Sequence, residues 1–242
     1  MLNSNEIAGF KENGFAGPFD LSDPSLVSRV SEIPQEEFEL REAKGGLQEK
    51  HFISPYSKRP LLCANTHLRH QPVLDLGRDA NIVAALSQLM APEILLRRSQ
   101  FWRKPPNARP VMWHQDTHKH RGLGFINEFS AWIALEDATK ENGCVWFLKG
   151  SSNGGVVPPA DFLDRRFQAK FYNSEELEVP EALAKFEAVP MEMKAGQFVL
   201  FHQLCFHASG PNKSDRERVG LAFRYLPGDR RDTVEDELVQ IA

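Results

Sequence analysis

The sequence predicts a mainly β fold with flanking helices: a double-stranded β-helix (a jelly roll, cupin-like) with an N-terminal helical layer. After Pro92 the chain carries eight short segments rich in β-branched and aromatic residues, separated by turn-forming clusters and with few helical patterns between them. The 242 residues contain no internal repeat and no Pro/Gly/Ser-rich linker. We therefore expect a single domain over 1–242, with 1–92 as a mostly helical layer and 93–226 as the jelly-roll core.

Three helices are predicted in the N-terminal layer. Residues 5–13 form a short helix that Gly14 closes. Ser22, Asp23 and Pro24 are typical of a helix start and lead into 26–31. Residues 79–90 carry apolar side chains at helical spacing and stop before Pro92, which predicts an amphipathic helix.

The predicted strands follow Pro92 and share short length, β-branched or aromatic composition and flanking turn residues. They are 94–102, 110–114, 129–135, 143–148, 188–193, 197–202, 205–209 and 218–225. Between the fourth and fifth strands, the segment 158–187 is charged and partly helical in pattern. We interpret it as an insert or lid over one end of the barrel.

Composition and charge exclude several classes of function. The net charge of -4 gives no reason to expect nucleic acid as a partner. No run of 18 apolar residues exists, and residues 1–11 lack the apolar core of a signal peptide, so we expect neither a membrane span nor secretion. The three cysteines are odd in number and far apart in sequence, which argues against a disulfide framework and indicates a reducing cytoplasm.

The pattern His114-Gln115-Asp116, with His207 far downstream, predicts a metal site. Residues i and i+2 of an extended strand point to the same face, so His114 and Asp116 can bind one ion together. Two imidazoles and one carboxylate are the ligands of the facial triad in non-haem Fe(II) oxygenases, which leaves the rest of the coordination shell open. In a chain with 8 histidines, a His-x-Asp pair occurs about as often as chance predicts. Independent features must therefore support the prediction of a metal site.

Residues 208–217 are dense in turn formers, which predicts a hairpin centred between Asn212 and Lys213. In that hairpin His207 and Arg218 are mirror positions with Cβ atoms about 5 Å apart. An arginine beside an iron ligand suits the C5 carboxylate of a 2-oxoglutarate cosubstrate, because its planar fork binds carboxylates with two hydrogen bonds. The alternative to a cosubstrate site is that the segment beginning at Arg218 forms an edge strand whose arginine side chains face solvent.

The last predicted strand has two distinct faces. Val219, Leu221, Phe223 and Tyr225 share one face and are expected to pack outward beneath the helices. Arg218, Gly220, Ala222 and Arg224 share the inner face. Because Gly220 and Ala222 are small, we expect a cavity for a cosubstrate beside them. Arg216 and Arg224 are expected on the same face of the strand as Arg218. Only the mirror relation to His207 favours Arg218 as the residue that binds the cosubstrate carboxylate.

The sequence resembles the phytanoyl-CoA dioxygenase family of Fe(II)/2-oxoglutarate oxygenases. The resemblance rests on short motifs in the right order: WHQD at 113–116, ATKENGC at 138–144, KGS at 149–151, HASGPN at 207–212 and the stretch from Arg218 to RY at 224–225. Upstream, NTHL at 65–68 and QFWRKPP at 100–106 also match. The resemblance implies a dioxygenase that uses Fe(II), 2-oxoglutarate and O2, hydroxylates an unactivated C–H bond and releases succinate and CO2.

The resemblance also implies roles for particular residues. His114, Asp116 and His207 would hold iron, and Arg218 would bind the C5 carboxylate of 2-oxoglutarate. Other residues implied in the cosubstrate pocket are Ser209, Trp132, Gln100 and Lys104. For Trp132 a purely structural role as a core aromatic stays open.

The chain departs from the family directly after Asp116. The run THKHR at 117–121 replaces the aromatics that are usual there, and His118, His120 and Arg121 are candidate substrate contacts. They predict a small polar or anionic substrate, with a solvated loop as the alternative. The other departure is KGSS at 149–152, where the family often has PGSH.

Two other functions were weighed. A non-oxygenase jelly-roll protein that binds a metal, as a binding or sensor module, has no need of Arg218. A radical halogenase needs a small residue in place of Asp116, so the carboxylate argues against it. We expect His67, His70 and His202 to be structural, because no third ligand accompanies them. Oligomeric state and the identity of the substrate stay open.

Overall fold

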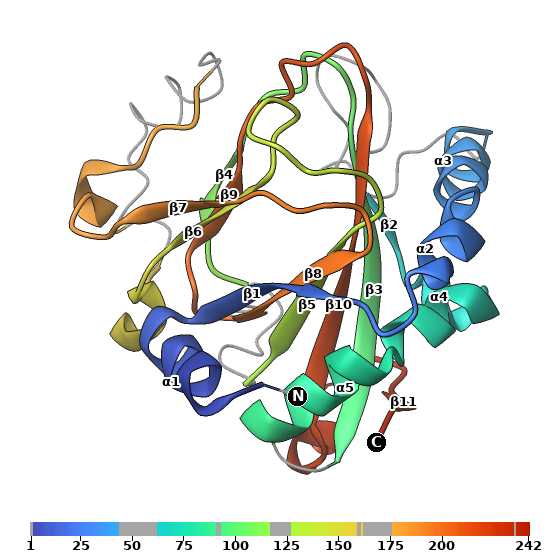
Figure 1. Cartoon of the computed structure of the whole chain (residues 1–242), viewed down its shortest axis with the longest axis horizontal. Coiled ribbons are helices and arrows are strands. Elements are labelled where there is room, and N and C mark those ends of the chain that lie inside the picture. The colour runs from blue at the N-terminus through green and yellow to red at the C-terminus, as the bar shows by residue number, and fades with distance from the viewer. Residues whose placement is uncertain are drawn as a thin grey trace.

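In the computed structural model, which describes residues 2–43, 62–90, 93–116, 127–158, 161, 176–234 and 236–242, two antiparallel sheets form the jelly roll (Figure 1). The larger sheet has the strand order β1 (Phe15–Asp20), β8 (Gln197–His202), β5 (Phe129–Ala134), β10 (Arg218–Pro227), β3 (Ile94–Lys104) and β11 (Val239–Gln240), with β2 (Leu62–Ala64) also paired to β3. The smaller sheet has the order β4 (Val111–His114), β9 (His207–Ser209), β6 (Val145–Leu148) and β7 (Ala188–Met191). The predicted fold class is therefore confirmed.

The described helices are short and lie mainly in the N-terminal part. They are α1 (Ser4–Asn13), α2 (Ser25–Val30), α3 (Ile33–Ala43), α4 (Gln71–Gly77) and α5 (Ala80–Leu89). Short 3-10 helices occur at η2 (Thr66–Leu68), η4 (Ser151–Gly154), η6 (Glu181–Leu183) and η7 (Gly228–Thr233). None of the described helices is long and apolar enough to cross a membrane.

Local sequence signals account for the helix ends. Asn3 begins α1 with a capping box, and Gly14 ends it in the left-handed region at φ 83°. Asp79 begins α5 by accepting hydrogen bonds from the backbone N–H groups of Asn81 and Ile82. The first ninety residues are nevertheless not only helical, because they also contribute β1 and β2 to the larger sheet.

The larger sheet separates two apolar layers. On its outer face Leu221, Phe223 and Tyr225 of β10 pack against side chains of the helices, including Leu76 of α4 and Ile82 of α5. Its inner face packs against the smaller sheet in a layer that contains Trp132, Ala222, Val199, Phe201, Phe147 and Val145. The predicted division of β10 into an outer and an inner face agrees with these two layers.

The predicted hairpin between His207 and Arg218 is wrong. β9 pairs with β4 and β6, whereas β10 pairs with β3 and β5, so the loop 210–217 crosses from one sheet to the other. Asn212, buried in this loop, fixes the crossing: its side chain donates to the carbonyl oxygens of Lys104 (2.9 Å) and Arg216 (2.7 Å). Turn-forming residues are equally suited to a hairpin and to such a crossing loop. The turn pattern alone therefore does not determine which strands the residues on either side of the loop pair with.

The insert is only partly described. Leu183 of η6 and Val179 pack with Trp113 and Phe206 at the edge of the smaller sheet. Residues 159–160 and 162–175 lie outside the described part of the chain, and the role of the insert as a lid stays a prediction.

Candidate metal centre

His114, Asp116 and His207 converge between the two sheets. His114 ends β4 and is paired with His207 of β9, and the two imidazole ring centroids lie 4.1 Å apart. Asp116 follows two residues later, with its carboxylate oxygens 3.9 Å from Nε2 of His114 and 3.6 Å from Nε2 of His207. One ligand atom from each residue lies within 4.8 Å of the others. Among the described residues no other three His, Cys, Asp or Glu side chains gather in this way.

Both histidines present the correct nitrogen to a metal. Nδ1 of His114 lies 2.8 Å from the carbonyl oxygen of Met112, and Nδ1 of His207 lies 3.0 Å from that of Cys205. Because a carbonyl oxygen only accepts, each Nδ1 carries the proton and each Nε2 keeps a free lone pair. Burial lowers the pKa of His207 to about 4, and burial together with His207 lowers the pKa of His114. Both imidazoles are therefore neutral at neutral pH, as metal binding requires.

Gln115 holds the segment that carries His114 and Asp116 in place. Its buried amide donates to the carbonyl oxygens of Gly155 and Leu204 (2.8 Å each) and accepts from the N–H of Val157 (2.8 Å). Four hydrogen-bonding positions exist on a glutamine amide, and three are used here. The middle residue of the motif thus fixes the backbone while its two neighbours face the metal position.

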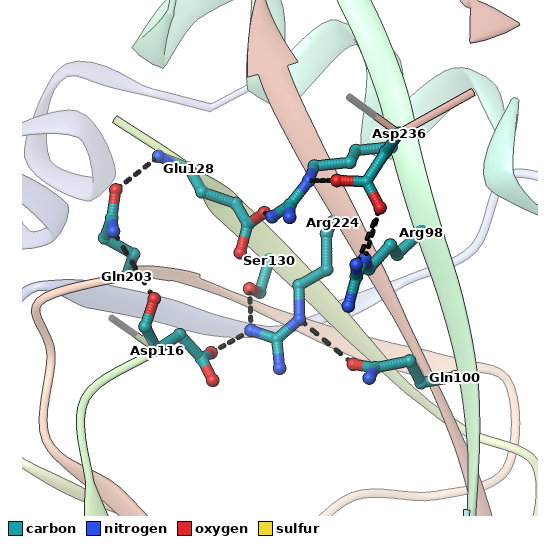
Figure 2. Close-up of polar contacts among 9 residues, drawn as sticks. Arg98, Gln100, Asp116, Glu128, Ser130, Gln203, Arg224 and Asp236 are labelled. Carbon is teal, nitrogen blue, oxygen red and sulfur yellow. Dashed lines mark hydrogen bonds and ion pairs between the residues drawn. The ribbon is translucent and has the colours of Figure 1, made fainter. Parts of the chain in front are cut away.

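Arg224 is the principal partner of Asp116. One terminal nitrogen of its guanidinium (Nη1) donates to the Asp116 carboxylate and to Oγ of Ser130 (2.7 Å), as Figure 2 shows. Burial, followed by the charges of Arg97 and Arg98, lowers the pKa of Arg224. Contact with Asp116 favours the charged guanidinium, which remains a cation at neutral pH. Alternation along the strand predicts that Arg224 faces inward. It does not predict a role for this residue, because it does not reveal which loop lies opposite.

A second group of predicted residues lies at the other end of β10. Nζ of Lys104 donates to Oγ of Ser209 and to the carbonyl oxygen of Arg109 (3.0 Å each). Arg218 is paired with Lys104 in the sheet, donates to the carbonyl oxygen of Gly143 (2.5 Å) and lies 5.2 Å over the ring of Trp132. The structure therefore brings together four of the predicted cosubstrate residues: Lys104, Ser209, Arg218 and Trp132.

This pocket has an unsatisfied positive charge. Arg218 and Lys104 are 3% and 5% exposed, and within the described part of the chain neither forms a salt bridge with a carboxylate, while Nε of Arg218 has no hydrogen-bond partner. Burial, and then the charge of Arg218, lowers the pKa of Lys104 well below its ordinary value. Burying the Arg218 guanidinium without an ion pair is costly, and among the described carboxylates only the nearby charge of Glu136 favours its charged form, so an anion that bonds to Arg218 and Lys104 would be favoured here.

One expectation about the pocket needs correction, and the structure adds detail to another. A Cβ atom on Gly220 would lie 2.1 Å from Cζ2 of Trp132, so the indole ring fills the space that the sequence suggested for a cosubstrate. Gln100 shares the inner face of β3 with Lys104, as predicted, but it lies four residues away and accepts from Nε of Arg224 (3.3 Å). Gln100 therefore contacts Arg224, the partner of Asp116, and its role in the cosubstrate pocket stays a prediction.

The remaining candidates do not join the site or cannot be placed. His118, His120 and Arg121 lie outside the described residues. His67 bonds to Ser99, and His70 to Glu37. His202 lies 3.3 Å from Asn127. These last three contacts agree with the structural roles expected for the three histidines.

The fold and the convergent His, Asp and His side chains define the class: a jelly-roll protein with a candidate 2-His-1-carboxylate metal centre. The model of the phytanoyl-CoA dioxygenase (PhyH) family matches residues 10–220, and the chain belongs to that family.

Curated relatives agree with the family assignment. A probable alpha-ketoglutarate-dependent hypophosphite dioxygenase of Stutzerimonas stutzeri is 30% identical over 167 residues, which are 68% of this chain and 56% of that protein. A 2-aminoethylphosphonate dioxygenase from an uncultured bacterium is 22% identical over 218 residues, 89% of this chain and 78% of that protein. The chain spans about half the length of the first of these relatives and of two animal phytanoyl-CoA dioxygenase domain-containing proteins.

Solved structures share the fold. EctD from S. alaskensis, solved with 2-oxoglutarate and 5-hydroxyectoine, aligns with a TM-score of 0.71 at 20% identity, over 95% of this chain and 78% of that one. CytC3 with Fe(II) and alpha-ketoglutarate aligns with a TM-score of 0.62 at 22% identity, over 94% of this chain and 78% of that one. At these identities the likeness concerns the fold alone.

Proposed function

We propose that this protein is an Fe(II)/2-oxoglutarate-dependent oxygenase. One observation carries the proposal: the His114, Asp116 and His207 cluster lies in the same barrel as the buried side chains of Arg218 and Lys104, neither of which forms an ion pair within the described residues. A protein that only binds a metal needs the His, Asp and His cluster but not the buried basic side chains. An enzyme that also binds a dicarboxylate beside the metal needs both.

The chain's own groups have distinct tasks in this proposal. Nε2 of each histidine and the Asp116 carboxylate hold Fe(II), and the carbonyl oxygens of Met112 and Cys205 keep the two rings oriented. Arg218 and Lys104, with Ser209, bind the distal carboxylate of 2-oxoglutarate, and Trp132 supports the Arg218 guanidinium. When bound, iron and 2-oxoglutarate supply oxidation by O2, with succinate and CO2 as products. The protein positions the target C–H bond and shields it from water.

Hydroxylation of a small polar or anionic molecule is the reaction we favour. Asp116 is a carboxylate, which supports hydroxylation over halogenation because it fills the position that a halide would need. The names of two relatives support an anionic substrate, since one is described as acting on hypophosphite and the other on 2-aminoethylphosphonate. Screening small anions for substrate-dependent succinate formation tests this part of the proposal.

The location and partners of the protein form a separate proposal. Cys63, Cys144 and Cys205 are buried and form no disulfide bond, which supports a reducing cytoplasm. The net charge of -4 supports small molecules rather than nucleic acid as ligands. Cell fractionation of a tagged protein tests the location.

An anaerobic titration tests the oxygenase proposal. Fe(II) with 2-oxoglutarate is expected to give a weak visible charge-transfer band in the wild-type protein. Arg218→Ala is expected to weaken the band at limiting 2-oxoglutarate. Arg216→Ala, which removes an arginine from the crossing loop, is the control and is expected to leave the band unchanged. If wild type gives no band, or Arg218→Ala does not alter it, the non-oxygenase metal-binding alternative is favoured.

A further inference from the structure

The Arg224 guanidinium is only partly used by the protein. Nη1 contacts Asp116 and Ser130, and Nε donates to Oε1 of Gln100 at 3.3 Å. Within the part of the chain that the structure describes, Nη2 has no protein partner, although Arg224 is only 6% exposed. A buried guanidinium with a free terminal nitrogen has unused capacity to bind an acceptor.

Gln100 adds donors on the same side. Because Oε1 accepts from Arg224, the amide nitrogen of Gln100 must point the other way, and no described protein group accepts from it. Figure 2 shows this amide nitrogen and Nη2 of Arg224 on the same side of the contact between the two residues, with the Arg224 guanidinium between Gln100 and Asp116. Together they offer at least three N–H groups to one space beside the candidate metal centre.

The surrounding charges leave this space positive once a metal is bound. Arg97 bonds to Glu128 (2.6 Å) and Asp236 (2.7 Å), and Arg98 bonds to Asp236 (2.6 Å). These two arginines and two carboxylates compensate one another. Figure 2 shows the pair of Arg98 and Asp236. The charge of Arg224 is compensated by Asp116. A divalent cation on Asp116 shares that negative charge, so Arg224 then favours a further anion nearby.

This position is distinct from the Arg218 pocket. Arg218 and Arg224 lie six residues apart on the inner face of β10, which corresponds to about 20 Å between their Cα atoms. The carboxylate bound at Arg218 is therefore not the group that Arg224 would bind. In the proposed function the other carboxylate of 2-oxoglutarate lies at the metal, so the affinity for 2-oxoglutarate must be measured separately from that for the substrate anion.

We propose that Arg224 and Gln100 recognise an oxyanion of the substrate, such as a carboxylate, phosphonate or phosphinate, beside the metal. This inference rests on the proposed oxygenase function and deepens it by assigning the substrate's anionic group to named residues. Arg224 also touches Asp116, so Gln100 is the better residue to vary. Gln100→Glu places a negative charge beside the anion, and Gln100→Met removes the donors with little change in shape.

The test uses the full chain loaded anaerobically with Ni(II) and 2-oxoglutarate. Calorimetry measures binding of 2-aminoethylphosphonate, hypophosphite and propionate, with propionamide as the neutral counterpart of propionate. We expect at least one anion to bind better than propionamide, and Gln100→Glu to weaken that anion about tenfold or more. Gln100→Met is expected to weaken it less, and the affinity for 2-oxoglutarate is expected to stay unchanged in both variants. Gln240→Glu on the exposed β11 is the matched control.

The outcomes separate this inference from the oxygenase proposal. If no anion is preferred over propionamide, or if Gln100→Glu binds anions as wild type does, the inference is wrong even when the Fe(II) and 2-oxoglutarate band forms. If Gln100→Glu weakens 2-oxoglutarate instead of the anions, the donors serve the cosubstrate's metal-side carboxylate, which also overturns the inference. If wild type gives no band, the oxygenase proposal itself fails.

Discussion

His114 and His207 are oriented by the same contact: each Nδ1–H donates to the carbonyl oxygen of the residue two positions earlier in the chain. This repetition on β4 and β9 orients both Nε2 atoms toward Asp116 before any metal is present. Because the rings need no reorientation, the entropy lost on metal binding is reduced. A preformed centre of this kind has consequences for stability that can be measured without activity.

Asp116→Asn is expected to destabilise the metal-free protein, because Arg224 then keeps a buried charge without a counter-ion. The loss is expected to be about 3 kcal/mol in the free energy of unfolding. Urea denaturation in the presence of a chelator measures it. Asp116→Asn combined with Arg224→Met removes both charges and is expected to recover part of the loss. Equal losses in the single and double variants would contradict the pairing.

Lys104→Met is expected to have opposite effects on stability and on cosubstrate affinity. Burial and the neighbouring charge of Arg218 disfavour an ionisable side chain at this position, so an apolar one is expected to stabilise the ligand-free protein by about 1 kcal/mol. The affinity for 2-oxoglutarate, measured by calorimetry with Ni(II), falls about tenfold because one partner of its carboxylate is lost. Lys149→Met, on an exposed position, is the control. A variant that loses stability but keeps its affinity would show that Lys104 is only structural.

Much of this arrangement could be predicted from local patterns. Alternation along β10 correctly placed Phe223 on the outer face of the sheet and Ala222 on the inner face. Successive strand residues face opposite sides, and one side meets the helices. His114 and Asp116 were paired by the same argument. His207 was predicted as the distant third ligand and Arg218 as its mirror position in a hairpin. Because that hairpin is wrong, the pairing of Arg218 with the site now rests on the resemblance to the family.

The features that the sequence predicted wrongly or did not predict depend on contacts between distant segments of the chain. The loop 210–217 carries turn residues that suit a hairpin, and only the buried bonds of Asn212 to Lys104 and Arg216 send it across to the other sheet. Likewise, no spacing along the chain connects Arg224 with Asp116, which are 108 residues apart. Such partners follow from how the two sheets stack, which a single sequence does not reveal.

Acid is expected to destabilise the metal-free protein through His67. This residue is 3% exposed, and burial, followed by the charge of Arg69, lowers its pKa to about 4 from an ordinary 6.5. The unfolded chain therefore takes up the proton first as the pH falls. The stability contributed by neutral His67 is complete above pH 6.5 and is lost between pH 6.5 and 4.

Thermal denaturation across this pH range, with a chelator present, measures the effect. A shift of this size corresponds to about 3 kcal/mol. His67→Gln cannot titrate and keeps a group able to bond to Ser99, so its stability is expected to depend less on pH than that of wild type. Some dependence remains in the variant, since burial also lowers the pKa of His202 and His207. Parallel pH profiles for the two proteins would show that His67 does not contribute.

Gly220→Ala is expected to disturb the cosubstrate pocket by displacing Trp132. The added Cβ would lie 2.1 Å from Cζ2 of the indole ring, which packs beneath Arg218. Overpacking of this kind costs about 1–3 kcal/mol, and a displaced Trp132 also removes support from the Arg218 guanidinium. Stability to urea and affinity for 2-oxoglutarate are therefore expected to fall together. Adding Trp132→Phe, whose shorter ring clears the new methyl group, is expected to restore stability. If that second change lowers stability further, the packing of Trp132 against Gly220 is not the cause.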